Sequence, residues 1–366
     1  MESYLFTEQA LVDVKRILKP GGIFVTYNFF RQSWLVERLA VMAESAFGCK
    51  PIVISLPYRK TLRASEQAGS ALIGFTVIIT SCNQHIAEAF AAHNDFWLNI
   101  RPAKNKNVDG FEVRPENVPA VERGEWQKIA PTTIIRNSGS PRFTTDDWPF
   151  LYVRDKLIPN LSIRSMIVLG ALGVAMVYLF LPKGRERMRI DGRMFFLGAA
   201  FMLLETKAVV QLALLFGSTW LVNSLVIFTA LILILLANLY VLKVWPKRLI
   251  WHYTGLFSIL AAAIAIPLDV FLSGGIFWRY VLPCMLALGP MFFAGVIFAR
   301  FFSDSIDPDI AFGSNIAGSL VGGLSESFSM LLGFRYLLFL AVAFYLLSAL
   351  IASRRDDSLD LNRASR

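Results

Sequence analysis

Long apolar stretches fill the second half of the chain and limit the folds that it can adopt. A helix needs about 20 residues to cross a bilayer, and a helix satisfies its own backbone polar groups within lipid. Seven stretches meet this length, and they lie near 165–181, 194–216, 219–242, 250–272, 277–302, 310–332 and 334–352. The sequence therefore predicts an all-α bundle of about seven transmembrane helices in a lipid bilayer, followed by a charged tail at 353–366.

The first 164 residues have the charge density of a soluble domain. They contain 20 Lys or Arg and 16 Asp or Glu, whereas residues 165–352 contain 12 and 8. The formal charge of +9 indicates Lys and Arg flanking the spans rather than nucleic-acid binding, because no basic and aromatic stripe accompanies it. We expect a soluble domain followed by a membrane domain, with no nucleic-acid partner.

Cysteine and histidine spacing excludes several kinds of site. No C-x-x-C pair and no His/Cys spacing typical of a zinc site occurs, so the pattern predicts neither a disulfide framework nor a metal site. The three histidines have no Ser or Cys nucleophile nearby and are expected at a surface or an interface. These residues are Cys49, Cys82, Cys284, His85, His93 and His252.

The soluble half begins with alternating helix and strand patterns. Apolar residues recur at helical spacing after a Thr7 cap, and Lys19-Pro20-Gly21-Gly22 ends this helix because Pro cannot continue it. The predicted elements are helix 7–18, strand 23–27, helix 33–47 and β-rich segments 52–56 and 72–80. This order fits the second half of a doubly wound α/β fold.

The stretch YLFTEQALVDVKRILKPGGIFVTYNFFRQSWLVERL resembles the fifth-strand signature of class I S-adenosylmethionine-dependent transferases. With IGFTVIITS and TTDDWPFLYVRDKLIP, it is most similar to spermidine synthases and their membrane-fused bacterial relatives. FMLLETKAVVQLALLFGSTWLVNS and SNIAGSLVGGLSESFSMLLGFR resemble the spans that follow such synthase domains. The resemblance implies the C-terminal half of a Rossmann-like methyltransferase fold over residues 1–100, joined to the membrane domain by a connecting segment at 101–164.

The resemblance also implies parts that this stretch does not contain. Members of the class hold S-adenosylmethionine or its decarboxylated form on a Gly-rich loop, and no G-x-G-x-x-G precedes a helix in residues 1–164. The loop and the catalytic acids are expected upstream of Met1 or in a partner subunit that supplies the N-terminal half. We therefore expect this chain alone to bind no cofactor.

Polar side chains follow the first predicted strand, at Tyr27, Asn28, Arg31 and Gln32. In open α/β sheets the ligand crevice lies outside the carboxyl ends of the strands, so these residues are candidates for a substrate crevice. The alternative interpretation is loop chemistry, in which Asn28 turns the chain and Arg31 is solvated. Spermidine synthases carry a Gln at the end of this strand, where Tyr27 is the nearest residue here, and a Tyr-Pro-x-Gly segment that 57–75 lacks. The acceptor, and the choice between aminopropyl and methyl transfer, stay open.

Ionisable residues interrupt two of the predicted spans. Glu205 and Lys207 are two residues apart and point to nearly opposite sides of a helix, whereas Lys207 and Gln211 share a face. In the sixth span Glu326 follows Ser314, Gly318 and Gly322 at steps of four, and the glycines permit close helix approach. An uncompensated charged side chain at the middle of the bilayer raises the free energy of membrane insertion by at least about 2.5–3.5 kcal/mol. A transport site and structural pairing within the bundle are both open.

Two functional hypotheses follow. The first is a membrane-bound, spermidine-synthase-like transferase that is inactive without its N-terminal half. The second is a transporter or membrane scaffold with a vestigial transferase-like domain.

Two lines of reasoning predict opposite orientations of the chain in the membrane. Basic loops after the first and third spans would place residues 1–164 outside by the positive-inside rule. The chemistry that the resemblance implies favours the cytoplasmic side of the plasma (inner) membrane, and we expect Trp148-Pro149-Phe150-Leu151-Tyr152 to pack on that membrane.

Overall fold

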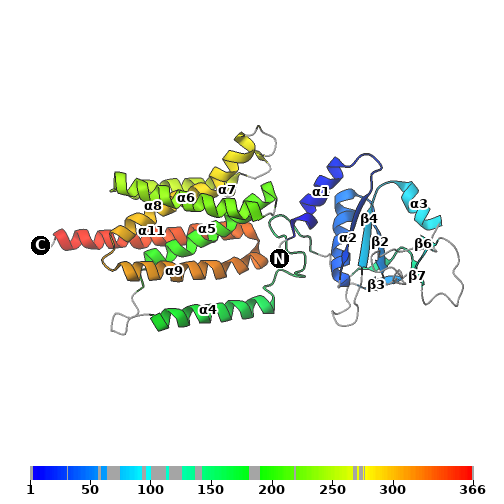
Figure 1. Cartoon of the computed structure of the whole chain (residues 1–366), viewed down its shortest axis with the longest axis horizontal. Coiled ribbons are helices and arrows are strands. Elements are labelled where there is room, and N and C mark those ends of the chain that lie inside the picture. The colour runs from blue at the N-terminus through cyan, green and yellow to red at the C-terminus, as the bar shows by residue number, and fades with distance from the viewer. Residues whose placement is uncertain are drawn as a thin grey trace, which may run out of the picture. The chain divides into compact units, whose positions relative to one another are not determined.

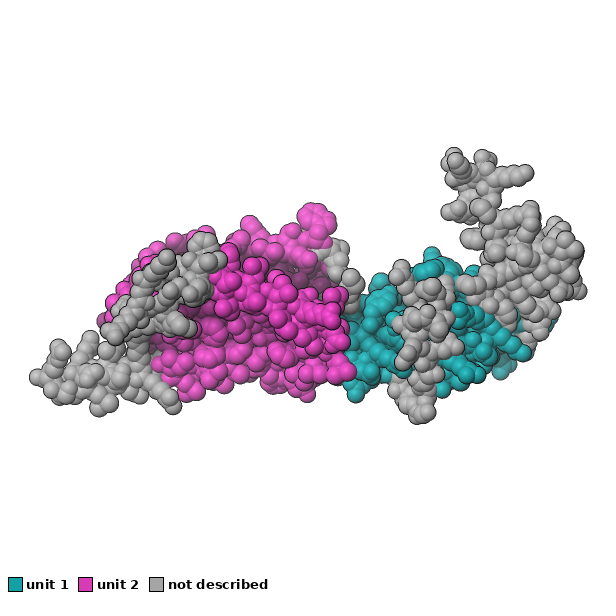
Figure 2. Space-filling model, turned by 90° about the horizontal axis from the view of Figure 1, so that it is seen from below, with its two compact units in different colours: residues 1–155 teal, residues 156–366 magenta. Residues whose placement is uncertain are grey.

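The chain forms two compact units, which we call the sheet unit (residues 1–155) and the helical unit (residues 156–366). Figure 2 colours the sheet unit teal and the helical unit magenta. The structure is a computed structural model that describes residues 3–30, 32–56, 59–63, 75–92, 96–99, 113–114, 126–136, 142–180, 190–217, 220–266, 270–271, 275 and 277–364.

The sheet unit combines three helices with short strands (Figure 1). In chain order its elements are α1 (Glu8–Ile17), β1 (Phe24–Phe29), α2 (Ser33–Phe47), β2 (Ile52–Leu56), β3 (Thr61–Arg63), β4 (Phe75–Thr80), α3 (Gln84–Ala92), β5 (Phe96–Asn99), β6 (Val113–Arg114), β7 (Trp126–Ile129) and β8 (Thr133–Ile135).

Local chemistry sets the ends of the first two helices. The Thr7 hydroxyl accepts a hydrogen bond from the backbone N–H of Ala10 at 3.2 Å, which caps α1 as its sequence predicts. Gly48 ends α2 in the left-handed conformation, with φ at 78°, which a residue with a side chain rarely adopts.

The principal sheet has the strand order β1-β4-β2, and β4 is antiparallel to both neighbours. β1 and β2 therefore run in the same direction, with α2 between them in sequence and β4 inserted between them in space. The predicted doubly wound sheet would have parallel neighbouring strands, whereas the neighbours in this sheet are antiparallel. The order of elements along the sequence does not show that β4, the last of these three strands in the chain, is the central strand of the sheet.

One face of this sheet packs on α2. Val53 and Ile78 are paired across β2 and β4, and both belong to one buried cluster with Val36 and Leu39 of α2. Side chains alternate between the faces of a strand, so Val25, Tyr27 and Phe29 of β1 lie on the other face.

The described parts of the predicted connecting segment (101–164) belong to the sheet unit as far as Asp155, and residues 156–164 belong to the helical unit. β8 pairs in parallel with β3, and β7 and β6 lie on either side of β5. The compact unit continues to Asp155, so the boundary between the two units lies between Asp155 and Lys156.

A disulfide joins Cys49 and Cys82, whose Cα atoms are 5.4 Å apart. The expectation that the distant cysteines form no disulfide is wrong for this pair. Cys49 follows the end of α2 and Cys82 follows the end of β4, and α2 contacts β4. Tertiary packing brings together two residues that are 33 positions apart in sequence.

The helical unit contains α4 (Asn160–Phe180), α5 (Gly192–Phe216), α6 (Trp220–Val244), α7 (Ile250–Ala265), α8 (Leu282–Ser303), α9 (Pro308–Ser325), α10 (Ser329–Leu332) and α11 (Phe334–Ala364). Within the described residues, four segments are long and apolar enough to cross a membrane: Gly192–Phe216, Val222–Val244, Leu282–Ser303 and Phe334–Ile351. The helices α4 and α7 are apolar but shorter over the residues searched. The chain therefore has a membrane domain with four candidate spans, and the count of seven stays a prediction.

α5 contacts α6, α8, α9 and α11, and so forms the centre of the helical unit. α4 runs along the edge of the unit beside α9 (Figure 1). Most apolar side chains of α4 are exposed, which is the arrangement expected of a helix that faces lipid.

Candidate functional site

A crevice of about 260 Å³ opens at the carboxyl end of β1, where the sequence predicts a substrate crevice. It lies within the sheet unit. Its lining residues are Phe29, Gln32, Trp34, Leu35 and Tyr152.

The four predicted crevice residues differ in whether they line this crevice. Gln32 lines the crevice, whereas Tyr27 and Asn28 lie on β1 and are absent from its described lining. The Asn28 side-chain oxygen accepts a hydrogen bond from the backbone N–H of Phe29 at 2.7 Å, as the loop interpretation expects. Arg31 lies outside the described residues.

The crevice offers little chemistry of its own. The Gln32 side-chain oxygen accepts a hydrogen bond from the Trp34 indole N–H, so this acceptor is already engaged. Aromatic and aliphatic groups form the rest of the described lining, without a carboxylate, an imidazole or an amine. Such a site binds an apolar or stacking group, but it lacks a described acid or base for proton transfer.

Arg38 of α2 contacts Trp34, one of the residues that line this crevice, and its role was not predicted from the sequence. The residue is 1 % exposed, and its guanidinium donates to the carbonyls of Leu151 and Val153 at 2.8 Å each. It also donates to the Arg154 carbonyl and lies 4.8 Å from the centre of the Trp34 ring. Burial lowers the pKa of Arg38 to about 10, and the charge of Asp155 opposes this shift.

These bonds overturn the expected membrane contact of the segment at 148–152. Trp148, Phe150 and Leu151 are buried inside the sheet unit, and only Tyr152 is exposed to a large extent. The carbonyl-rich turn is held by a buried cation on α2, so the apolar side chains complete a core rather than a membrane-facing patch. A lone Arg within a helical pattern gives no signal of this role.

The acid pair before this segment has a structural role at Asp146. The Thr7 hydroxyl donates to an Asp146 carboxylate oxygen at 2.6 Å, and the Asp146 backbone N–H donates to the Gln9 side chain at 3.2 Å. Burial raises the pKa of Asp146, which the Thr7 hydrogen bond opposes. His85 pairs with Glu88 at 3.5 Å on an exposed surface, and His93 lies outside the described residues.

The intramembrane candidates differ in how deeply they are buried. Gln211 is buried, whereas Glu205, Lys207 and Glu326 are half-buried. The Lys207 ammonium lies 5.9 Å from the centre of the Phe334 ring, a cation–π distance. Glu326 lies at the end of α9, where the helix tightens into a 3₁₀ turn before α10.

The glycine stripe is a packing seam between α5 and α9. A Cβ atom on Gly318 would fall far inside contact distance of the Phe195 carbonyl oxygen, and one on Gly322 would do the same at Ala199. The Asn315 amide donates to the Met194 carbonyl at 3.0 Å across this seam. The predicted close approach is confirmed, and its consequence is structural.

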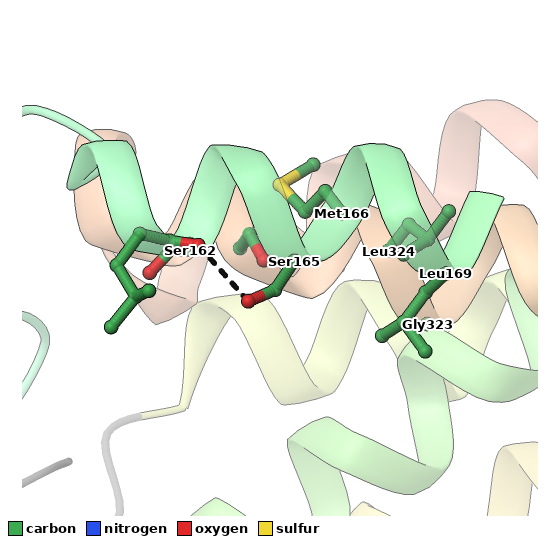
Figure 3. A pocket seen from close by; sticks show the side chains of 8 residues that line it. Ser162, Ser165, Met166, Leu169, Gly323 and Leu324 are labelled. Carbon is green, nitrogen blue, oxygen red and sulfur yellow. Dashed lines mark hydrogen bonds between the residues drawn. The ribbon is translucent and has the colours of Figure 1, made fainter. Parts of the chain in front are cut away.

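A second cavity, of about 320 Å³, lies between α4 and α9 within the helical unit (Figure 3). Its lining is made of hydroxyl, glycine and apolar residues: Leu161, Ser162, Ser165, Met166, Leu169, Gly323, Leu324 and Ser327. The Ser165 hydroxyl donates to the Leu161 carbonyl at 3.0 Å, the dashed line in Figure 3. No charged residue is in this lining, so the cavity does not gather the intramembrane acids or Lys207.

A polar network that the sequence reading missed joins the first turn of α5 to three other helices. The Asp191 carboxylate accepts from the Arg193 backbone N–H at 3.0 Å and caps α5. The Ser348 hydroxyl of α11 donates to the Arg193 carbonyl at 3.1 Å and is hydrogen-bonded to the Tyr253 hydroxyl of α7 at 3.2 Å. The Asp191 N–H donates to Ser314 of α9 at 2.9 Å. The signal in the sequence was an Asp directly before an apolar stretch.

No metal-binding group of three His, Cys, Asp or Glu residues occurs in the part of the chain that the structure describes. No protein family, no curated protein and no solved structure matches the chain significantly.

Proposed function

We propose that the chain is a membrane-anchored binding module, in which the helical unit holds a transferase-like half-sheet that docks a second polypeptide segment. The single observation that carries this proposal is the open face of the sheet. Val25, Tyr27 and Phe29 of β1 are 45 %, 66 % and 58 % exposed, and Phe75 of β4 is 38 % exposed beside them. Contiguous exposed apolar surface of this kind marks interaction sites.

The edge of β1 supports the same proposal. Among the described strands β1 pairs only with β4, so its other edge has backbone N–H and C=O groups without a strand partner. Edges that stay free are protected by charges, proline or bulges, and the strand FVTYNF contains no charge and no proline. Addition of an extended segment to such an edge is a common mode of peptide recognition.

The occupant that we propose is a β-strand segment of the complementary half of a class I transferase-like fold. In that fold, the strand that β1 resembles lies inside a larger sheet. β1 and β2 run in the same direction with α2 connecting them, as in a β-α-β unit, and mixed sheets of this kind are common among doubly wound folds. A Rossmann-like half-fold is thus part of the proposal.

A second candidate function is the transferase itself, with transfer of an aminopropyl or methyl group from S-adenosylmethionine or its decarboxylated form. The position of the Gln32 crevice at the carboxyl end of β1 favours it. The docked half would then have to supply the Gly-rich loop and the acids. Glu205→Gln and Lys207→Met test the transporter alternative, which requires loss of uptake or efflux with unchanged folded yield.

We further propose that α4, α7 and α9 complete a bundle of seven spans around the four candidate spans. α9 packs on α5 along the glycine seam, and α7 packs on α8. The membrane that we propose is the plasma (inner) membrane, in line with the membrane-fused bacterial proteins that the sequence resembles.

Photo-crosslinking of the full chain in native membranes tests the docking. A benzophenone amino acid at position 27 should give an adduct that maps to one polypeptide segment with alternating apolar residues, and Phe29→Lys should abolish it. The control is the same probe at position 88, where the Glu88 side chain is 70 % exposed on α3. Equal adduct yield at both positions, or adducts with lipid alone at position 27, would contradict the proposal.

Calorimetry with S-adenosylmethionine separates the two functions. The purified chain should bind none, and under the transferase alternative the chain with its docked segment should bind it. Binding by the purified chain alone would contradict both forms of the proposal.

A further inference from the structure

Basic residues are concentrated at one end of the helical unit, and contacts within that unit define this end. The Arg300 guanidinium of α8 donates to the Pro246 carbonyl after α6 at 3.3 Å. The Arg193 guanidinium of α5 lies 4.6 Å from the centre of the Phe301 ring of α8. With the Asp191–Ser314 bond to α9, these contacts bring together the first turns of α5 and α9 and the last turns of α6 and α8.

Seven described Lys or Arg residues belong to this end. They lie in the first turn of α5, in the last turn of α6, between α6 and α7, at the end of α8 and late in α11: Arg193, Lys243, Lys247, Arg248, Arg300, Arg354 and Arg355. Four more basic residues, Lys183, Arg185, Arg187 and Arg189, precede α5 in the sequence and lie outside the described residues. The opposite ends of these helices, with the connection before α4, contribute Lys156, Arg164, Arg279 and Arg335. Lys and Arg in short connections near span ends are the residues that set orientation, with the richer side in the cytoplasm.

The chain enters the helical unit at the opposite end. An added Cβ on Gly170 of α4 would lie 3.6 Å from Leu324 of α9, and one on Gly173 would contact Leu320, so α4 and α9 are antiparallel. The lining of the cavity between these helices agrees with this direction, because it includes both Leu161 at the start of α4 and Ser327 after α9. Since α9 begins at the basic end, α4 begins at the other end, and the sheet unit precedes it in sequence.

The disulfide of the sheet unit independently indicates that this unit lies on the side of the membrane away from the cytoplasm. Cys49 and Cys82 form a disulfide, and disulfides form and persist in oxidising compartments but are rare in the cytosol.

We propose that the basic end of the helical unit faces the cytoplasm and that the sheet unit lies on the opposite, oxidising side of the membrane. There Cys49 and Cys82 are oxidised by a thiol–disulfide oxidant. The two thiols lose two protons and two electrons, their sulfur atoms become bonded, and the disulfide of the oxidant is reduced to two thiols. This assignment replaces the cytoplasmic location expected from the resemblance.

The location has a consequence for function, although it does not rest on the docking proposed above. S-adenosylmethionine is not expected outside the cytoplasm, so a sheet unit on the oxidising side acts as a binding module rather than as the acceptor half of a transferase. A partner that reaches the open face of β1 is then itself exported or carries an external domain.

Site-specific labelling in intact cells tests the orientation with the full chain in a Cys284→Ser background. The two probes are Glu88→Cys on the exposed surface of α3 and Lys247→Cys in the exposed connection between α6 and α7. A membrane-impermeant maleimide should label position 88 in intact cells and position 247 only after permeabilisation. Labelling of position 247 in intact cells, or protection of position 88 until permeabilisation, would overturn the proposal.

The redox state of the native cysteines gives a second readout. Cells are quenched with acid, and free thiols are alkylated with a mass tag before and after reduction. Cys49 and Cys82 should acquire the tag only after reduction, and the pair should become reactive in cells that lack periplasmic thiol-oxidising activity. Full tagging without reduction in normal cells would overturn the proposal. Neither readout depends on a partner for β1, so failure here is distinguishable from failure of the docking.

Discussion

The seam between α5 and α9 and the open face of β1 are both uncharged surfaces, but only one of them is closed. At the seam the backbones approach so closely that Gly318 and Gly322 have no room for a side chain. On β1 the side chains of Val25, Tyr27 and Phe29 remain largely exposed. In the helical unit, the glycine face of α9 packs against α5 of the same chain. In the sheet unit, the apolar face of β1 and its outer edge are not covered by a described element. The proposed second polypeptide would cover this surface of the sheet unit.

The largest effect is expected inside the sheet unit, at Arg38. Arg38→Ala removes the donors to three carbonyls and leaves a buried space, and we expect a loss of about 3–5 kcal/mol in the free energy of unfolding. Urea unfolding of the full chain, followed by tryptophan fluorescence, measures it. The matched control Arg16→Ala, on an exposed pair with Asp13 at 3.0 Å, should change it by no more than about 0.5 kcal/mol. Equal effects of the two variants would show that the Trp148–Leu151 segment is not held by Arg38.

A smaller loss is expected at the closed seam. Gly318→Ala places a methyl group against the Phe195 carbonyl oxygen, so α5 and α9 must separate at a cost of about 1–3 kcal/mol. Unfolding of the full chain in mixed micelles measures this cost. Gly313→Ala is the control, because nothing lies within 4 Å of a Cβ added there. If Gly318→Ala is as stable as Gly313→Ala, the seam is not tight.

A pH-dependent effect is expected at Asp146. Because its folded-state pKa is raised, the folded state binds this proton more readily than the unfolded state does, so its contribution to stability falls as pH rises from the ordinary Asp value through the raised one. Asp146→Asn should flatten this slope and keep a hydrogen bond with Thr7. Urea midpoints measured across that pH range test it, and an unchanged slope would assign the pH dependence to another group.

The smallest effect on stability is expected at the open face. Tyr27→Ser removes a side chain that is 66 % exposed, so the free energy of unfolding should change by about 0.5 kcal/mol or less. The same variant should reduce the fluorescence of a hydrophobic dye bound to the sheet unit. A loss of stability comparable to that of Arg38→Ala would mean that this face is already covered within the chain.

The sequence predicts well those features that depend on neighbouring residues. The Thr7 cap, the turn after α1 and the bounds of α2 follow from local chemistry, and the glycine seam follows from simple spacing.

Features that depend on distant contacts were not predictable. The pairing of β4 with β1, the Cys49–Cys82 bond and the burial of Trp148 on Arg38 each join residues more than 30 positions apart. The apolar segment 148–152 was the clearest error, because its composition suits a membrane surface and a protein core equally well.

Hydrogen–deuterium exchange of the β1 peptide tests the central claim most directly. In the purified chain, the amides of Phe24–Phe29 that do not pair with β4 should exchange rapidly, while amides of α5 along the seam stay protected. In native membranes, where we propose that a partner segment binds, the same β1 amides should become protected and α5 should not change. Equal exchange of β1 in both preparations would contradict the account, because the open edge would then have no occupant.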